Sequence, residues 1–216
     1  MRNIINYLLL ILFLIISINL IADDKYLVNL GILKKKIKEY YNSGEYDNEM
    51  KKIIDDAINN LNNLKLPKNP AFVFDIDETS LSNMEYELKY DFGYSKDTWD
   101  NWVNEGKAIA IREVKRFYDT LVSRNIAIIF ITGTNLSQFD ITKKNLISEG
   151  YFKFDTLICR NNQELHLKAI EYKSNKRRNL SEKYTIIGSI GDQWSDLDGG
   201  WTILKIKLPN YMYYIE

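Results

Sequence analysis

Apolar residues near the start of the chain recur at helical spacing. Side chains three or four positions apart are apolar in two stretches, which predicts two amphipathic helices separated by a break at Ser43 and Gly44. Their polar faces mix charges of both signs, so packing on the domain is favoured over binding to a membrane surface. The apolar positions are Leu27, Leu30, Leu33 and Ile37, then Met50, Ile53, Ile54, Ala57, Ile58, Leu61 and Leu64.

Beyond these helices, short apolar runs alternate with further helical patterns. Buried parallel strands read as continuous apolar runs, so the alternation predicts an α/β fold with an open, mainly parallel sheet flanked by helices. In such a sheet the ligand site lies outside the C-terminal ends of the strands. The predicted strands are 71–74, 126–132, 154–158, 184–190 and 203–208, and the predicted helices are 114–122, 136–149 and 164–171.

The segment between the first strand and the next helix is too long for an ordinary connection. We therefore expect residues 82–107 to form a small cap inserted after the first strand. The segment is rich in aromatic side chains, which can either stack on a planar substrate group or form the cap's own core. A core role is the more common one for any single aromatic residue. The aromatic residues are Tyr86, Tyr90, Phe92, Tyr94, Trp99 and Trp102.

Polar motifs follow three of the predicted strands. The first strand runs into DIDET, the second into ITGT, and the fourth into GDQWSD. In DIDET, Asp75 and Asp77 are two positions apart, so on extended backbone both carboxylates face the same way. Taken alone, the pair is as consistent with helix capping as with chemistry. Three polar motifs at one edge of a sheet are much harder to explain by capping, and they favour an active site.

Composition narrows the classes of function. The 216 residues, 45% of them hydrophobic, are enough for one main domain. Basic and acidic residues balance at 29 each, so no net charge attracts a nucleic acid polymer, and we expect a small-molecule partner. The single histidine, His166, excludes phosphate-ester mechanisms that need two. Cys159 lies in an apolar stretch and is expected in the core.

The first residues have the layout of an export signal. No charged residue occurs between Asn3 and Ala22, while Arg2 precedes this stretch and two aspartates follow it. We therefore expect residues 1–22 to be a signal peptide and residues 23–216 to form the domain. The unbroken apolar run, 7–16, is short for a membrane span, which needs roughly 18 residues. Leu20 stands where signal cleavage prefers a small residue, so a retained membrane anchor is the alternative.

The ordered motifs resemble those of a known superfamily. DIDET, ITGT, the YKS of residues 172–174 and GDQWSDL are similar to the four motifs of the haloacid dehalogenase-like (HAD) superfamily. The further segments LSN, TWDNWV and KLPNYMYYIE resemble its class B-like acid phosphatases, a group of plant acid phosphatases, related vegetative storage proteins and exported bacterial acid phosphatases. The resemblance covers residues 64–216 and implies a HAD-like, Rossmannoid sheet with a small cap.

The resemblance also implies catalytic roles. Asp75 would attack phosphorus to form an aspartyl-phosphate, and Asp77 would protonate the leaving alcohol and later take a proton from water. Thr132 and the backbone amide of Gly133 would hold the phosphoryl oxygens. Lys173 would place a positive charge against the phosphoryl group. Without the resemblance, a lysine in such a basic run would be read as a solvated surface charge.

The same resemblance implies Mg²⁺ as the cofactor. Its ligands would be the carboxylates of Asp75 and Asp192 and the backbone carbonyl of Asp77. Asp196 and Thr79 would support the site, with Asp196 acting through a metal-bound water or by pairing with the motif lysine. Hard oxygen ligands suit Mg²⁺, and the absence of His and Cys from these motifs argues against zinc.

One position departs from the family pattern. Many relatives have Arg where this chain has Thr134, so a cation that usually helps to order the site is missing. The nucleophile, the acid/base, the lysine and the metal aspartate are all present. The resemblance implies an exported Mg²⁺-dependent acid phosphatase for small phosphomonoesters such as nucleotides or aryl phosphates. The alternatives are a non-catalytic storage or ligand-binding protein on the same fold, and a HAD phosphotransferase.

Overall fold

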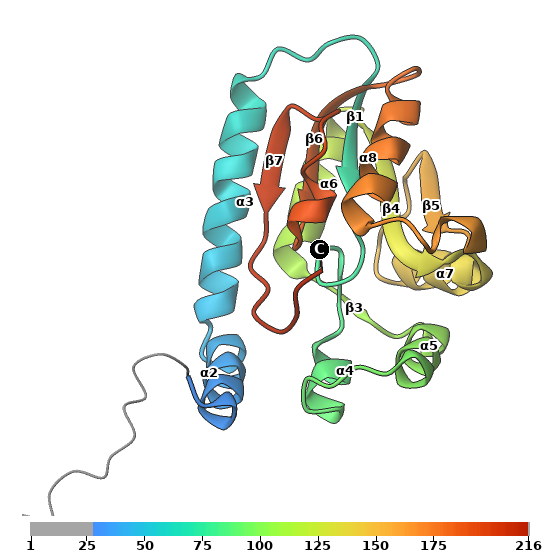
Figure 1. The fold of residues 1–216 in the computed structure, drawn as a ribbon. Coiled ribbons are helices and arrows are strands. Elements are labelled where there is room, and N and C mark those ends of the chain that lie inside the picture. Colours follow the sequence, from blue (N-terminus) through green and yellow to red (C-terminus); the bar gives the residue numbers. More distant parts are fainter. Residues whose placement is uncertain (1–27, 216) are drawn as a thin grey trace, which may run out of the picture. The chain divides into compact units, whose positions relative to one another are not determined.

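The computed structural model describes residues 28–215 (Figure 1). The predicted signal segment lies outside these residues. The chain divides into two units, Met1–Lys36 and Ile37–Glu216, and the boundary falls within the first described helix, α2 (Leu30–Asn42). Of the helices described, none is both long enough and apolar enough to cross a lipid bilayer.

The second unit is built around a five-stranded sheet in the order β5-β4-β1-β6-β7. All four strand pairs are parallel, so the predicted α/β fold is confirmed. The central strand β1 lies between β4 and β6, which brings the carboxyl ends of these three strands to one place. The strands are β1 (Pro70–Phe74), β4 (Ala127–Asn135), β5 (Thr156–Arg160), β6 (Thr185–Gly191) and β7 (Leu204–Lys207).

Helices cover both faces of the sheet (Figure 1). Phe72 and Phe74 of β1 point into the larger core, which α3 (Glu45–Asn63) and α6 (Arg112–Ser123) complete. The alternate residues of β1 point into a smaller core that α8 (Ala169–Leu180) covers. Gly188 of β6 is required by this packing, because a Cβ atom there would lie 2.2 Å from the ring of Phe72. The site-bearing strand is therefore fixed from both sides.

One predicted helix is wrongly placed. Residues 164–171 do not form it; a short 3-10 turn (Asn162–Glu164) is followed by α8, which begins at Ala169. The misplacement has a physical reason, because the buried side chains of α8 are Tyr172, Lys173 and Arg177. Polar residues on the inner face hide the apolar periodicity by which a helix is recognised. The predicted helix at 136–149 corresponds to a 3-10 turn (Leu136–Gln138) followed by α7 (Phe139–Ser148).

Two short helices follow β1, and we refer to residues 82–107 as the cap segment. It contains α4 (Met84–Lys89) and α5 (Lys96–Glu105), and the antiparallel pair β2 (Leu81–Ser82) and β3 (Ile109–Ala110) closes its base. Its aromatic rings pack on one another: Tyr86 is buried and meets the ring of Trp99 edge-on at 5.1 Å. Of the six aromatic residues, Tyr86 and Trp102 belong to the hydrophobic core, Tyr90 and Trp99 pack against it, and only Tyr94 is exposed, so most of these rings serve the segment's own packing rather than a stacking surface.

Candidate active site

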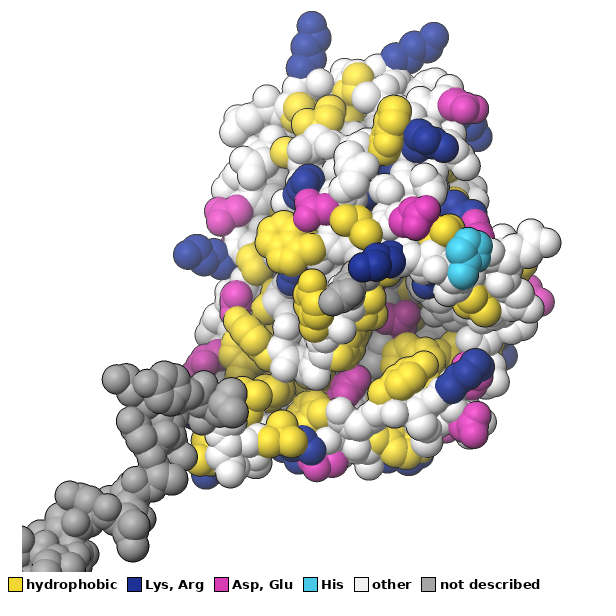
Figure 2. Space-filling model, in the orientation of Figure 1, with side chains coloured by type: hydrophobic (Ala, Val, Ile, Leu, Met, Phe, Trp, Pro, Cys, Tyr) yellow, Lys and Arg dark blue, Asp and Glu magenta, His cyan; other side chains and the backbone are white. Residues whose placement is uncertain are grey.

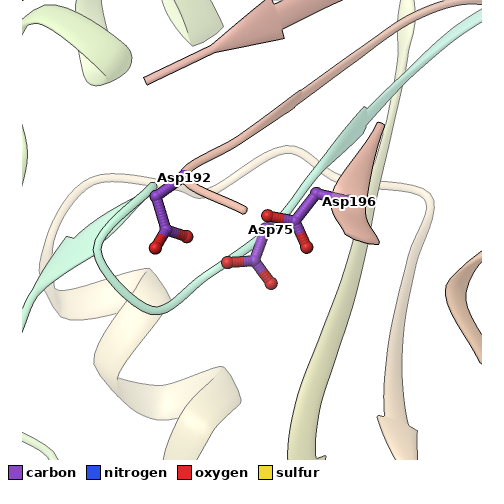
Figure 3. Close-up of side chains that lie close together, drawn as sticks. All are labelled: Asp75, Asp192 and Asp196. Atoms are coloured by element: carbon purple, nitrogen blue, oxygen red, sulfur yellow. The ribbon is translucent and has the colours of Figure 1, made fainter. Parts of the chain in front are cut away.

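The polar motifs of the sequence meet at the carboxyl edge of the sheet. Asp75 directly follows β1, Asp192 directly follows β6, and Asp196 lies in the 3-10 turn (Trp194–Asp196) beyond it. One carboxylate oxygen from each of the three lies within 4.8 Å of the others, and Figure 3 shows the three side chains turned toward one another. In Figure 2, acidic side chains lie in a hollow bordered by hydrophobic ones. The sheet therefore gathers these carboxylates from two distant segments.

Lys173 binds two of the three carboxylates. Its Nζ donates to Oδ1 of Asp75 at 2.5 Å and also to Oδ1 of Asp196. Burial raises the pKa of Asp75 well above its usual value and the charge of Asp196 adds to this, while Lys173 opposes it. Burial also opposes the charge on Lys173, but the two carboxylates outweigh it and raise the pKa of the ammonium group. The predicted catalytic lysine is therefore a buried cation held against Asp75.

Asp192 is oriented by neutral donors. Its Oδ2 accepts hydrogen bonds from Nε2 of Gln193 and Nδ2 of Asn210, each at 2.7 Å. Its Oδ1 lies 3.2 Å from Oγ1 of Thr79, and that hydroxyl lies 3.3 Å from Oδ2 of Asp75. Burial and the charge of Asp196 raise the pKa of Asp192 to about 6, although the two amide donors act against the shift. The predicted supporting residue Thr79 thus bridges two of the three predicted metal ligands, Asp75 and Asp192.

Asp77 occupies a different environment from Asp75. Its Oδ1 accepts from Nδ2 of Asn83 at 3.1 Å, and its Oδ2 lies 3.4 Å and 3.3 Å from the hydroxyls of Thr132 and Thr134. Burial raises the pKa of Asp77, and these neutral donors partly offset the effect. Thr132, predicted to hold phosphoryl oxygens, therefore contacts Asp77 here. Thr134, at the position that departs from the family pattern, contributes a third donor to the same carboxyl group.

The end of β4 is shaped to leave backbone exposed beside the site. The register between β4 and β5 shifts between Ile131 and Asn135, so the ladder is interrupted over the ITGT motif. Gly133 is exposed there, and a Cβ atom at this position would meet nothing within 4 Å. This openness is consistent with the predicted role of the Gly133 amide toward a phosphoryl oxygen.

The comparisons with known proteins identify the family. The family model described as HAD superfamily, subfamily IIIB (Acid phosphatase) matches residues 24–216. The chain belongs to this family. It is 38% identical over 186 residues to the stem 28 kDa glycoprotein of Glycine max, and 31% identical over 186 residues to acid phosphatase 1 of Solanum lycopersicum. Each alignment covers 83% of this chain and 73% of the relative.

A solved structure supports the fold. The class C acid phosphatase of Bacillus anthracis superposes with a TM-score of 0.71 at 24% identity, and the match covers 87% of each chain. The predicted HAD-like acid phosphatase fold is therefore confirmed. Family and relatives together make the chain a phosphomonoesterase, which confirms the predicted class of enzyme.

Enzymes of the HAD family use a divalent metal ion, and the residues here suit one. The three clustered aspartates are buried and offer only hard oxygen ligands. Both oxygens of Asp196 are already engaged, one by Lys173 and one by the backbone amide of Gln193 at 2.9 Å. Oδ2 of Asp75 and Oδ1 of Asp192 accept only longer bonds from the Thr79 hydroxyl, at 3.3 Å and 3.2 Å, so these two oxygens are the best placed to bind a cation.

Several residues of the site escaped prediction. Asn83, Gln193 and Asn210 all donate to carboxylates that are predicted to be catalytic or metal-binding, yet their only sequence signal is membership in the LSN, GDQ and LPN segments. Arg177 lies in a basic run of the sequence, but it is fully buried and donates to the backbone carbonyls of Asp196 and two later residues. It fixes the loop that carries the fourth motif.

Proposed function

We propose that this chain is an exported, Mg²⁺-dependent acid phosphatase that hydrolyses small phosphomonoesters through an aspartyl-phosphate on Asp75. The observation that carries the proposal is the setting of Asp75, which lies between the ammonium group of Lys173 and the carboxylate of Asp192. A carboxylate beside a fixed cation stays available as a nucleophile. When bound, Mg²⁺ would supply positive charge that offsets the crowded carboxylates and the phosphate.

The first half of the reaction uses both acids of DIDET. Asp75 attacks phosphorus, and the bond between phosphorus and the ester oxygen breaks as the new bond forms. Asp77 gives a proton to the departing oxygen, so the alcohol leaves neutral. Lys173 and the Gly133 amide stabilise the charge on the phosphoryl oxygens.

The second half reverses the roles. Asp77, now ionised, takes a proton from a water molecule, which attacks the phosphorus of the aspartyl-phosphate and releases Asp75 and inorganic phosphate. The two environments support this division of labour. Asp75 faces an ammonium group, while Asp77 faces neutral donors from Asn83, Thr132 and Thr134, so the two carboxyl groups are held in different ways.

Aromatic phosphomonoesters, such as aryl phosphates and nucleotides, are the proposed substrate class. The cap segment's rings do not support this directly, because they pack on one another. Tyr213 supports it, since its backbone carbonyl lies 3.4 Å from Nε2 of Gln193, the residue next to Asp192, and Tyr213 is only partly buried there. Export is supported by the charge-free stretch and basic start within residues 1–22.

A non-catalytic storage role is the alternative, because a vegetative storage protein of Arabidopsis thaliana is among the relatives. The two functions are separated by assaying p-nitrophenyl phosphate, phenyl phosphate and nucleoside monophosphates with purified protein. We expect hydrolysis that EDTA abolishes and added Mg²⁺ restores. Asp75→Asn should abolish turnover, whereas Asp198→Asn, which removes a surface ion pair with Lys205, should retain it. Undiminished activity in Asp75→Asn would refute the mechanism, and absence of activity in the metal-loaded native protein would favour storage.

A further inference from the structure

Asn83 stands at the N-cap of α4 but does not cap it. Asparagine is among the preferred N-cap residues, because its side-chain oxygen accepts a bond from the free amides of the first turn. No such bond is formed by Asn83 with any residue in the range 28–215. Its side chain is committed elsewhere: Oδ1 accepts from Nε1 of Trp102 at 2.7 Å, and Nδ2 donates to Oδ1 of Asp77 at 3.1 Å. Asn83 thus makes contacts with residues outside the helix instead of the capping bond that its position favours, and such a departure from local preference points to a function.

The orientation of this amide follows from chemistry. The indole Nε1 of Trp102 can only donate, so it requires the oxygen of Asn83 to face it. The NH₂ group must then face Asp77, where a carboxyl oxygen accepts. An amide turned the other way would set two donors against each other at Trp102. Trp102 therefore determines which end of Asn83 meets the acid/base.

Both residues behind Asp77 are rigidly held. Asn83 is 2% exposed and Trp102 is 5% exposed. The backbone N–H of Asn83 donates to the carboxylate of Glu78, and Trp102 packs in the core beside Tyr86. A cavity of about 20 Å³ borders them, which has room for little more than one water molecule. A side chain this confined can transmit the position of the cap segment to the group that it bonds.

The two oxygens of Asp77 are consequently held by different parts of the fold. The hydroxyls of Thr132 and Thr134 approach Oδ2 from β4, and Asn83 approaches Oδ1 from the start of the cap segment. Asp77 lies just beyond the end of β1 and forms a β-bridge with Leu81, so its backbone is fixed, but the torsion of its carboxyl group depends on these bonds. Proton transfer needs this group aimed at the departing oxygen.

We propose that Asn83, anchored by Trp102, is a positioning residue through which the cap segment orients Asp77 for proton transfer to the leaving group. The inference rests on the proposed function, since it takes Asp77 as the acid. It ties the cap segment to the chemical step as well as to substrate access. Removing either hydrogen bond of the Asn83 side chain should leave Asp77 in place but with its carboxyl group misoriented.

Leaving groups of different basicity test this. Phenoxide, with a conjugate acid near pKa 10 like that of tyrosine, needs a proton to depart, whereas p-nitrophenoxide needs little help, and the two substrates are otherwise alike. General acid catalysis contributes about 10²–10⁴-fold, so partial misorientation in Asn83→Ala or Trp102→Phe should lower kcat/KM for phenyl phosphate by about tenfold or more. The loss for p-nitrophenyl phosphate should stay within about threefold.

Two reference variants make the result decisive. Trp99→Phe is the matched control, because Trp99 lies on the same helix α5 and its indole N–H has no hydrogen-bond partner in the described part of the chain. It should lower both rates equally or not at all. Asp77→Asn tests the acid role itself, and if it shows no preferential loss with phenyl phosphate, the proposed function fails at that step.

A different result would overturn the positioning role alone. If Asp77→Asn shows the preferential loss but Asn83→Ala and Trp102→Phe lower both rates alike, the proposal is overturned and Asn83 is structural. Thermal melting of each variant shows whether it folds, and Trp102→Phe, which keeps an aromatic ring in the core, provides the test if Asn83→Ala does not fold.

Discussion

Removing divalent metal ions should make the stability of this protein depend on pH through Asp192. The pKa of its carboxyl group is raised from 3.8 to about 6 by burial and by Asp196. Below pH 3.8 the group is protonated in both the folded and unfolded chain and has no effect. Above about pH 6 it is ionised in both, and the folded chain then carries the full cost of an unneutralised buried charge. The metal-free protein should therefore lose stability as the pH rises through this window.

The size of the effect follows from the same shift. At about 1.36 kcal/mol per pKa unit, the change at Asp192 amounts to about 3 kcal/mol, of which about 1.4 kcal/mol falls between pH 5 and pH 7.5. The pKa of Asp75 is raised in the same direction and adds to the trend. Acids in ion pairs, such as Glu164, have lowered pKa values, so they change the stability only at pH values below their ordinary pKa of 4.5. Between pH 5 and pH 7.5 the buried aspartates act in the same direction as the buried glutamates Glu78 and Glu87, whose pKa values burial also raises, so all these groups favour lower stability at the higher pH.

The assay is urea unfolding followed by tryptophan fluorescence, for which the chain has four tryptophans. In EDTA, the free energy of unfolding should be lower at pH 7.5 than at pH 5. Added Mg²⁺ should reduce this difference by neutralising the aspartates that bind it, while the contribution of Glu78 and Glu87 should remain. A metal-free protein that is equally stable at both values, or more stable at pH 7.5, would refute the reasoning.

Asp192→Asn is a matched control. The amide oxygen can still accept from Gln193 and Asn210, and the new NH₂ group can donate to Oγ1 of Thr79, so the hydrogen bonds survive while the charge is lost. In EDTA at pH 7.5 this variant should be more stable than the native protein by up to about 3 kcal/mol. Its stability should no longer respond to Mg²⁺. A variant less stable than the native protein would show that the charge is not what costs stability.

Two further substitutions probe the same site. Lys173→Met leaves Asp75 and Asp196 buried without their cation, which should lower the free energy of unfolding by about 3–5 kcal/mol and reduce turnover. Urea unfolding at pH 7.5 measures the loss of stability, and a variant as stable as the native protein would contradict the prediction. Asn210→Ala removes one of the two amides that orient Asp192, so Mg²⁺ should bind about 10- to 100-fold more weakly. Calorimetric titration with Mg²⁺ measures this, and an unchanged affinity would exclude the C-terminal residues from the metal site.

The sheet and its motifs were predictable because each carries a distinct pattern. Buried parallel strands read as apolar runs, and Asp75, Thr132 and Asp192 each follow such a run, so their convergence follows from parallel pairing. The helix that bears Lys173 was misplaced because its inner face is polar. A buried lysine cannot be told from a solvated one without knowing what it faces, and its partner Asp75 lies 98 positions away.

The asparagines of the site were not predictable on physical grounds. Asn83 occupies a helix N-cap, where asparagine is expected for local reasons, so nothing in the sequence shows that its amide is used elsewhere. Asn210 follows a proline near the last strand and reads as a turn residue. In both cases the role depends on a contact between segments far apart in sequence. Such contacts leave no periodic signal.

The central position of β1 also determines at which stage of folding the site forms. This strand pairs with segments far along the chain on both sides, Ala71 with Ala127 and with Ile186, and Thr79 meets Asp192 across 113 positions. Contacts of such long range form late in folding, because large loops must close first. A partly folded chain therefore holds neither the carboxylate cluster nor its lysine. If the chain is exported unfolded, as proposed, this topology would keep hydrolysis off until the sheet has formed.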